Sequence, residues 1–229
     1  MTDTAVLRLE DLGKRFGANR PALFEGLNLE LRPGEYLAIM GESGVGKSTL
    51  LNMLAGLDRP DTGRVLIDGL ELSSLNDDAL TLMRRRSVGF VFQAFHVLPY
   101  LSVAQNVALP LDLLGVTEPE RSTRTDQILE AVGLGALARR YARELSGGEV
   151  QRIAIARALV HKPRLVLADE PTGNLDARSA AQILALLRSQ IKANAGAGIL
   201  ITHSRAAAES ADRILVLDSD GFIPLGRSA

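Results

Sequence analysis

Apolar and polar residues follow two patterns along this chain of 229 residues. Residues 6–9 and 27–31 alternate between apolar and polar side chains, which is typical of half-buried strands in an antiparallel sheet. Other segments are largely apolar without alternation, like strands that are covered on both faces in a parallel sheet. These segments are residues 36–40, 88–92, 164–170 and 198–202. The patterns predict an α/β fold with a mainly parallel sheet, in which 198–202 is the last core strand.

Helical patterns fill the spaces between the predicted core strands. Residues 117–144 are charged and helical in pattern, which predicts a helical subdomain. Ser102 and Ser146 are the predicted N-caps of two helices, because a serine hydroxyl accepts a hydrogen bond from the first helical turn. The helix after Ser146 is expected to run to about residue 160, and a further amphipathic helix is expected to open at 174–176.

Composition and charge exclude several classes of site. The chain has 26 basic and 27 acidic residues, so it lacks the electrostatic footprint of a nucleic-acid-binding protein, and we expect no nucleic-acid partner. It contains no cysteine, and His96, His161 and His203 are too scattered in sequence to indicate a metal cluster. Residues 1–5 lack the features of a secretion signal, and no apolar stretch is long enough to span a bilayer. We expect a cytoplasmic chain that does not cross a membrane.

The segment with the most specific chemistry begins at Gly41 and ends at Thr49. Its pattern is G-x-x-x-x-G-K-S between a predicted strand and a predicted helix, which is the setting of a phosphate-binding loop. Its glycines can adopt positive φ, and the first N–H groups of the helix have no intrahelical partner. Lys47 is expected to reach the β- and γ-phosphates of a nucleotide, and the Ser48 hydroxyl to ligate the Mg²⁺ that bridges them. The loop alone does not separate a kinase, a GTPase, a motor or a transporter ATPase.

Three predicted core strands end in polar residues, where ligand groups collect in open α/β sheets. Asp169 is expected in the coordination sphere of the Mg²⁺, and Glu170 is expected to be a general base that polarises an attacking water. Gln93 could reach the Mg²⁺ or a water, or could simply end a strand. His203 could be catalytic or could only hydrogen-bond its surroundings.

A second anion site is indicated by Ser146-Gly147-Gly148-Glu149, where the two glycines leave the first N–H groups of the capped helix accessible. Two anion sites in separate subdomains are hard to bring onto one phosphate within a single chain. The sequence therefore gives a first indication of a dimer.

Two aromatic segments have two interpretations each. Phe16 either stacks on an adenine ring or is an ordinary aromatic of an edge strand, and the local residues favour the second. The segment that begins at Phe95 and ends at Leu101 either packs in the core or lines a groove for a partner. We predict a docking groove for a helix of a partner, because the segment directly follows Gln93 and could share its nucleotide-dependent movement.

Taken together, these motifs resemble the nucleotide-binding subunits of ATP-binding-cassette (ABC) transporters, over nearly the whole chain. That family has, in order, a phosphate loop, a Gln loop, a signature segment, a strand ending in Asp-Glu, a D-loop and a switch histidine. The matching positions here are 41–49, Gln93, 146–149, Asp169-Glu170, 174–176 and His203. The resemblance implies ATP and Mg²⁺ as cofactors and ATP hydrolysis as the activity. It also implies ATP sandwiched between two cassettes, with the signature of one facing the phosphate loop of the other.

The resemblance implies three overlapping sets of site residues. The catalytic residues are Lys47, Gln93, Glu170 and His203. The nucleotide-binding residues are Phe16, Gly41, Ser43, Gly44, Gly46, Lys47, Ser48, Thr49, Ser146, Gly147, Gly148, Glu149 and Asp176. The metal ligands are Ser48, Gln93 and Asp169.

Three positions depart from the family pattern. Glu149 stands at the fifth signature position, where Gln is commoner. Phe16 stands where Tyr is usual, which keeps the stacking face and removes the hydroxyl. Ser204 follows the histidine where Asp is common.

Within the family, residues 92–99 and 172–176 look most like the lipoprotein-releasing and macrolide-efflux type of ATPase. Importer subunits share parts of these segments and are the alternative. A soluble cassette ATPase of DNA repair or translation would need a coiled-coil insertion, a second cassette or a basic face, none of which the sequence shows. A P-loop kinase would need an acceptor site and a lid, and would have no use for residues 145–149.

The resemblance also implies how the chain is organised. We expect one ABC ATPase domain over residues 1–229, with a P-loop NTPase core and an antiparallel β subdomain in 1–93 and 160–229. An α-helical subdomain is expected in 94–159, ending in the signature motif. The expected partners are a second ABC subunit, forming a homodimer, and an integral membrane permease. Docking on the permease would place the protein peripherally on the cytoplasmic face of the inner membrane.

Overall fold

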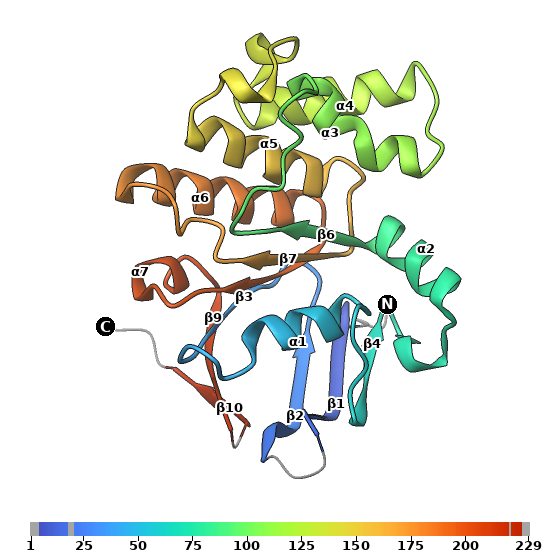
Figure 1. Cartoon of the computed structure of the whole chain (residues 1–229), viewed down its shortest axis with the longest axis vertical. Helices are drawn as coiled ribbons and strands as arrows, with labels where there is room; N and C mark the ends of the chain where they lie inside the picture. Colours follow the sequence, from blue (N-terminus) through green and yellow to red (C-terminus); the bar gives the residue numbers. More distant parts are fainter. Residues whose placement is uncertain (1–4, 18–20, 220, 226–229) are drawn as a thin grey trace.

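A six-stranded sheet forms the centre of the fold (Figure 1). The computed structural model describes residues 5–17, 21–219 and 221–225. The strands of this sheet are β3 (Tyr36–Met40), β6 (Val88–Val91), β7 (Leu165–Asp169), β8 (Ala197–Ile201), β9 (Arg213–Asp218) and β10 (Gly221–Pro224). Their order is β10-β9-β3-β8-β7-β6, and every neighbouring pair is parallel except β9 and β10. The predicted mainly parallel sheet is confirmed.

The prediction that 198–202 is the last core strand is wrong, because β9 and β10 follow it. β9 pairs in parallel with β3 and lies between β3 and β10. Its apolar residues, 214–217, form a run of only four between Arg213 and Asp218. A run of this length does not distinguish a buried strand from other buried segments.

A second, four-stranded sheet is antiparallel, as predicted. Its strands are β1 (Leu7–Arg15), β2 (Ala22–Leu31), β4 (Thr62–Ile67) and β5 (Leu70–Glu71), in the order β2-β1-β4-β5. The predicted segment 27–31 is only the last part of β2, and the predicted segment 6–9 overlaps β1 only at residues 7–9. The pairing of β1 shifts register after Leu9, where Asp11 adopts a positive φ of 48°. Such an irregularity interrupts the alternation by which a strand is recognised in sequence.

The central sheet has a hydrophobic core on each face. In β3, Leu37 and Ile39 point into the core shared with the antiparallel sheet, whereas Tyr36 and Ala38 point into the core shared with the helices above. All four side chains are fully buried. The strand therefore has no polar face, which is why its sequence is continuously apolar.

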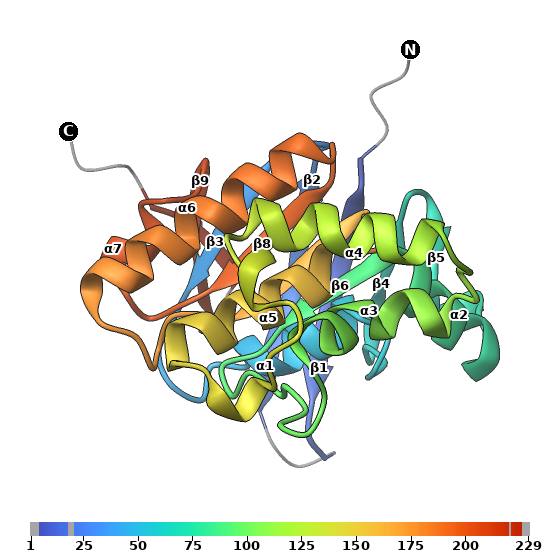
Figure 2. The same cartoon turned by 90° about the horizontal axis from the view of Figure 1, so that it is seen from above.

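The helices are distributed over both faces of the central sheet (Figures 1 and 2). They are α1 (Lys47–Leu54), α2 (Asp77–Ser87), α3 (Val103–Leu113), α4 (Glu120–Ala131), α5 (Gly147–Leu159), α6 (Ala177–Ala193) and α7 (Arg205–Ala208). Helices α3 to α6 cover the upper face in Figure 1, and α1 lies between the two sheets. The exact division of the chain into subdomains at residues 94 and 159 stays a prediction. No helix in the described ranges is both long and apolar enough to cross a membrane.

The caps predicted for two of these helices are confirmed. Ser102 caps α3 in a reciprocal capping box with Gln105, and Ser146 caps α5 in the same way with Glu149. Helix α5 ends at Leu159, close to the expected residue 160.

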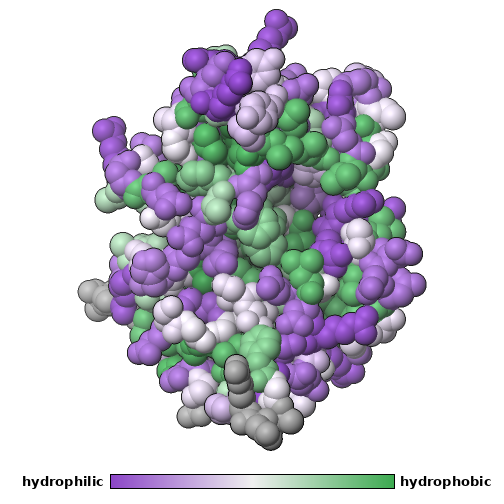
Figure 3. All heavy atoms as spheres, viewed as in Figure 1, coloured by the Kyte–Doolittle hydropathy of each residue, from purple (hydrophilic) through white to green (hydrophobic). Residues whose placement is uncertain are grey.

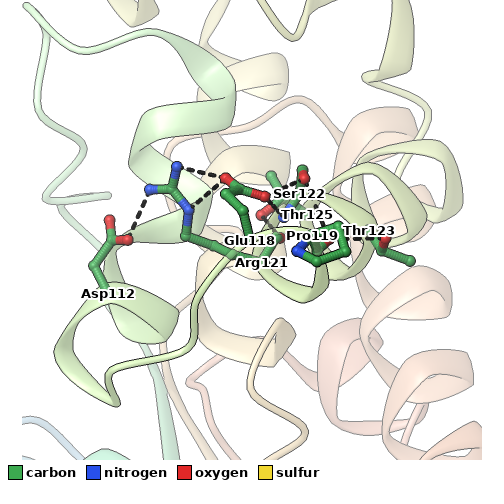
Figure 4. Close-up of polar contacts among 7 residues, drawn as sticks. All are labelled: Asp112, Glu118, Pro119, Arg121, Ser122, Thr123 and Thr125. Atoms are coloured by element: carbon green, nitrogen blue, oxygen red, sulfur yellow. Dashed lines mark hydrogen bonds and ion pairs between the residues drawn. The ribbon is translucent and has the colours of Figure 1, made fainter.

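Arg121 forms hydrogen bonds that stabilise the connection between α3 and α4 (Figure 4). Its guanidinium donates to Asp112 at 2.8 Å and to Glu118 at 2.7 and 2.9 Å. Hydrogen bonds from Ser122, followed by those from Arg121, hold the pKa of Glu118 down at about 2. All of these groups are exposed, so the network fixes the geometry of the connection more than it stabilises the fold.

Candidate active site and adjoining groove

The phosphate loop leaves β3 and enters α1 through a glycine that no other residue could replace without strain. Gly46 caps α1 in the left-handed conformation, with φ at 103°. A Cβ at this position would lie 2.5 Å from the Leu23 side chain and 2.9 Å from Phe24. Glycine is therefore required both by the backbone conformation and by the close packing against β2.

Lys47 lies across this loop. Its ammonium donates to the carbonyl oxygens of Gly41, at 2.8 Å, and Glu42, at 2.7 Å. No ion pair joins Lys47 to a carboxylate anywhere in the part of the chain that the structure describes. Backbone carbonyls therefore hold this ammonium in place with no carboxylate paired to it among the described residues, and its charge suits an anionic ligand.

Asp169, at the end of β7, meets the first turn of α1. The Ser48 hydroxyl donates to an Asp169 carboxylate oxygen at 3.3 Å. Burial raises the pKa of Asp169, and this effect is opposed by the Ser48 hydrogen bond and by the charge of Lys47. A partly buried carboxylate that is disfavoured in its charged form would be relieved by a cation beside it.

These two oxygen ligands fit Mg²⁺. The described residues contain no group of three or more acidic, histidine or cysteine side chains that could hold a metal ion by themselves. Mg²⁺ is commonly bound by one or two protein oxygens together with water and substrate phosphates, and not by a complete protein cage. That Ser48 and Asp169 form a site of this kind stays a prediction.

Glu170 and His203 are in direct contact at the ends of neighbouring strands. Both the backbone N–H of His203, at 2.8 Å, and its ring Nδ1, at 2.7 Å, lie against Oε1 of Glu170. The Thr202 hydroxyl donates to the other carboxylate oxygen at 3.2 Å. Glu170 has a positive φ of 45°, an unfavourable conformation for a residue with a side chain, and such residues are concentrated at functional sites.

Gln93 reaches the same edge of the sheet from β6. Its carbonyl accepts a hydrogen bond of 3.2 Å from the Asn174 side chain. Its side-chain amide lies beside Gly173, where an added Cβ would be 3.1 Å from Nε2. Gly173 in turn donates its N–H to the carbonyl of Glu170 at 3.1 Å. The strand ends thus bring Gln93, Asp169, Glu170 and His203 to one edge.

Phe16 lies just beyond β1, at the phosphate-loop end of the antiparallel sheet. Arg15, the residue before Phe16, pairs with Ala22 of β2. Leu23, the residue after Ala22, packs against Gly46 of the phosphate loop. Half of the Phe16 ring is exposed, and the ammonium of Lys14 lies 5.7 Å from its centroid. An exposed ring in this position could stack on a planar base, which stays a prediction.

The signature segment, residues 146–149, is exposed at Ser146 and Gly147. No atom lies within 4 Å of a Cβ added to Gly147 or Gly148. Ser146 and Glu149 bond each other, and these hydrogen bonds lower the pKa of Glu149. No hydrogen bond or ion pair between described residues connects this segment to residues 41–49. The structure therefore does not bring the two predicted anion sites together within one chain.

Asp176 has a clear local role. Its carboxylate caps α6 by accepting from the N–H groups of Arg178, at 3.0 Å, and Ser179, at 3.1 Å. The hydrogen bonds from Ser179 lower the pKa of Asp176. Its predicted contact with nucleotide would have to come in addition to this cap.

The structure explains one departure from the family pattern and adds a residue that sequence reasoning missed. Ser204 caps the short helix α7 by accepting from the N–H of Ala207 at 3.3 Å. Asp and Ser are comparable N-caps, so either can stand at this position.

Thr202, which bonds Glu170, was missed because it resembles any polar residue at the end of a strand. Its only sequence signal is its place directly before His203.

A groove adjoins this edge on the side of α3, and Figure 3 shows the hollow between the upper and lower parts of the molecule. We call it the α3–β6 groove; its lining includes Arg85, Phe90, Phe92, Leu109, Leu113 and Arg157. The segment predicted to form a docking groove, residues 95–101, begins three residues after Phe92 and is not among the residues that line this groove. Within that segment Tyr100 is 75% exposed and Leu98 is 47% exposed, so these two side chains are not part of the core.

Comparison with known proteins gives consistent results. A family model described as ABC transporter matches residues 24–173. The lipoprotein-releasing system ATP-binding protein LolD of Pseudomonas syringae pv. tomato is 48% identical, over 97% of this chain and 99% of that protein. The macrolide export ATP-binding/permease protein MacB of Brucella abortus is 44% identical, over 97% of this chain and 34% of that protein. The solved dimer of the ATP-binding cassette MJ0796 bound to ADP and Pi has a TM-score of 0.83 and 35% identity, and the match covers 97% of this chain and 100% of that one.

Proposed function

Because the chain belongs to the ABC transporter family and is one of its ATP-hydrolysing subunits, we propose that it works as a homodimer with two ATP molecules at its interface. In this proposal the dimer powers a membrane permease of the lipoprotein-release or macrolide-export type. The similarity to LolD over the full length of both chains supports this choice, as does the similarity to the matching part of MacB.

The observation that carries the proposal is the open signature segment. Ser146 and Gly147 are exposed, and among the described residues no atom outside α5 and the adjoining chain lies within 4 Å of a Cβ added to Gly147 or Gly148. The phosphate loop, in contrast, carries the Lys47 ammonium, which backbone carbonyls hold in place. A second copy could supply its signature segment to this loop and receive the first copy's signature in return, which makes a closed symmetric pair.

The residues of the phosphate loop and of the sheet edge have different roles in the proposed hydrolysis. Lys47 binds the β- and γ-phosphates, and Ser48 and Asp169 would hold a Mg²⁺ that would neutralise phosphate charge when bound. Glu170 accepts the proton of the attacking water, and His203 and Thr202 hold its carboxylate in position. Gln93 lies beside Glu170 and Asn174, from where its amide could contact the γ-phosphate or the water.

The α3–β6 groove is the proposed docking site for a cytoplasmic helix of the permease. Apolar side chains of α3 and of the end of β6 line it, and the exposed Leu98 and Tyr100 follow in the chain. Docking there would hold the protein peripherally at the cytoplasmic face of the membrane.

The test uses Glu170→Gln, because the amide keeps the shape of the side chain and cannot accept a proton. We expect this variant to bind ATP, to lose hydrolysis and to elute as a dimer with MgATP but as a monomer with MgADP. Size-exclusion chromatography with light scattering measures the mass. Adding Ser146→Arg, which places bulk at the open end of α5, should return the protein to a monomer. A monomer of Glu170→Gln under both nucleotide conditions would contradict the proposed dimer.

A further inference from the structure

Arg157 connects the signature helix to the segment that follows Gln93. It lies near the C-terminal end of α5, about three turns from the Ser146 cap. Its guanidinium donates to the carbonyl of His96 at 2.7 Å and to that of Phe95 at 3.0 Å. One planar side chain therefore holds two successive backbone carbonyls in a fixed relation to α5.

The backbone at these two carbonyls adopts an unfavourable conformation. Phe95 and His96 both have positive φ, at 54° and 47°, and neither is a glycine. Two successive residues of this kind persist only when contacts around them hold the conformation. Other contacts beside this turn include the Phe92 ring, whose centroid lies 4.8 Å from that of the His96 imidazole with the two planes nearly perpendicular. The N–H of Phe95 donates to the carbonyl of Phe92 at 3.3 Å, and Asn106 holds residues 98–102 to α3.

Arg157 is also unusual as a half-buried cation without a paired anion. In the described part of the chain no carboxylate forms an ion pair with it. Burial lowers the pKa of Arg157, so the charge is held at a cost. A side chain needed only for packing could be apolar, whereas donating hydrogen bonds to two carbonyls at once requires the planar guanidinium.

We propose that Arg157 is a positioning residue that transmits movement of the signature helix to the α3–β6 groove. The proposal rests on the proposed function, in which the N-terminus of α5 contacts the ATP held by a second copy. A shift of α5 on dimerisation would carry the guanidinium with it and displace the turn at Phe95 and His96. Because Arg157 itself lines the groove, the same movement would change the shape that a docking helix meets.

The experiment is hydrogen–deuterium exchange on the full chain in the Glu170→Gln background, with and without MgATP. We expect MgATP to slow exchange in residues 41–49 and to change exchange in residues 94–98 by at least about threefold. Adding Arg157→Lys should leave the change in 41–49 and reduce the change in 94–98 to less than about 1.5-fold, because an ammonium cannot span both carbonyls. The matched control is Arg152→Lys on the same helix, whose arginine binds Val132 and Gln182 instead and should keep the full response.

The outcomes separate this proposal from the one it rests on. If MgATP neither protects 41–49 nor produces a dimer, the proposed function is wrong. If both occur and 94–98 does not respond, or responds equally in Arg157→Lys, the role of Arg157 is wrong. A purely structural role would raise exchange in 94–98 by the same factor with and without MgATP, which would also overturn the proposal. Should Arg157→Lys fail to fold, Arg157→Gln, whose amide reaches only one carbonyl, carries the same expectations.

Discussion

The imidazole Nδ1 of His203 lies 2.7 Å from Oε1 of Glu170, and the two side chains differ sharply in exposure. The histidine side chain is 74% exposed, whereas the carboxylate side chain is only 14% exposed. Since a carboxylate oxygen accepts, Nδ1 carries the hydrogen in this contact. An exposed surface ring therefore helps to orient a largely buried carboxylate, whose own backbone has a positive φ.

Replacing His203 tests whether this orientation matters for hydrolysis. In His203→Ala, Glu170 keeps the backbone N–H of residue 203 and the Thr202 hydroxyl but loses the ring. We expect kcat to fall about 100-fold, in the range typical of a disturbed general base, with little change in ATP affinity. Steady-state ATPase assays and equilibrium nucleotide binding measure the two quantities. Unchanged kcat would show that the ring does not assist Glu170.

Lys47→Ala removes the cation of the phosphate loop. A unit charge 4 Å from a phosphate is worth about 4 kcal/mol at an effective dielectric of about 20, which is an upper scale for the loss. We expect ATPase activity to fall to background. Because the ammonium also holds the carbonyls of Gly41 and Glu42, the loop itself should loosen, which exchange of residues 41–49 would report. Near wild-type turnover at saturating MgATP would contradict the assignment of the loop.

The sequence predicted the strand ends better than it predicted the contacts between them. Asp169 and His203 could be placed because long apolar runs end at polar residues, and parallel strands end at one edge. The bond between His203 and Glu170 could not be predicted, because it depends on the positive φ of Glu170 and on the pairing of β7 with β8. The strand β9 was missed because four apolar residues between charged ones carry no period.

Asn106 should be a structural anchor of the docking segment. It is fully buried, accepts from the N–H of Leu98 at 2.8 Å and donates to the carbonyls of Leu98, Leu101 and Ser102. Asn106→Ala leaves the N–H of Leu98 without its acceptor and takes a side-chain donor from three carbonyls that keep backbone donors. We expect the free energy of unfolding to fall by about 2 kcal/mol. Asn106→Asp should be worse, because it sets an acceptor against three carbonyls. Urea unfolding measures both, and a loss for Asn106→Ala within about 0.5 kcal/mol would contradict this role.

His161 should make stability depend on pH. Burial lowers the pKa of His161 below its usual 6.5, and the hydrogen bond to the Val88 carbonyl only partly offsets this. The folded state therefore favours the neutral ring. Below about pH 6.5 the unfolded chain takes up the proton first, so stability is lost as pH falls towards the folded-state pKa, by at most about 1.4 kcal/mol per pH unit.

The measurement for His161 is urea unfolding at several pH values between 7.5 and 5. His161→Gln keeps a donor for the Val88 carbonyl and should remove this part of the pH dependence. His96→Gln, at an exposed position, is the matched control and should follow the wild type. Equal pH dependence in His161→Gln and in the wild type would show that the ring does not contribute.

The last prediction concerns the surface beside the α3–β6 groove. Tyr100 is 75% exposed, and Leu113, which lines the groove, is 60% exposed. If these residues served only the core, an aspartate at either position should lower the thermal midpoint; their exposure predicts that it does not. We expect Tyr100→Asp and Leu113→Asp to stay folded but to lose co-purification with membranes of cells that carry the permease, because a charge would be buried at the contact.

The control for this prediction is Leu57→Asp. Leu57 is 57% exposed, comparable to Leu113, and lies beyond the end of α1, outside the groove residues. It should recover with membranes at wild-type yield, which shows that a surface aspartate alone does not prevent association. If Tyr100→Asp and Leu113→Asp are folded and also recover at wild-type yield, the permease does not dock here. That result would require a different surface for the membrane partner. It would leave the proposed ATP binding and dimerisation standing, because Lys47→Ala and the mass of Glu170→Gln with MgATP test these two properties independently of membrane association.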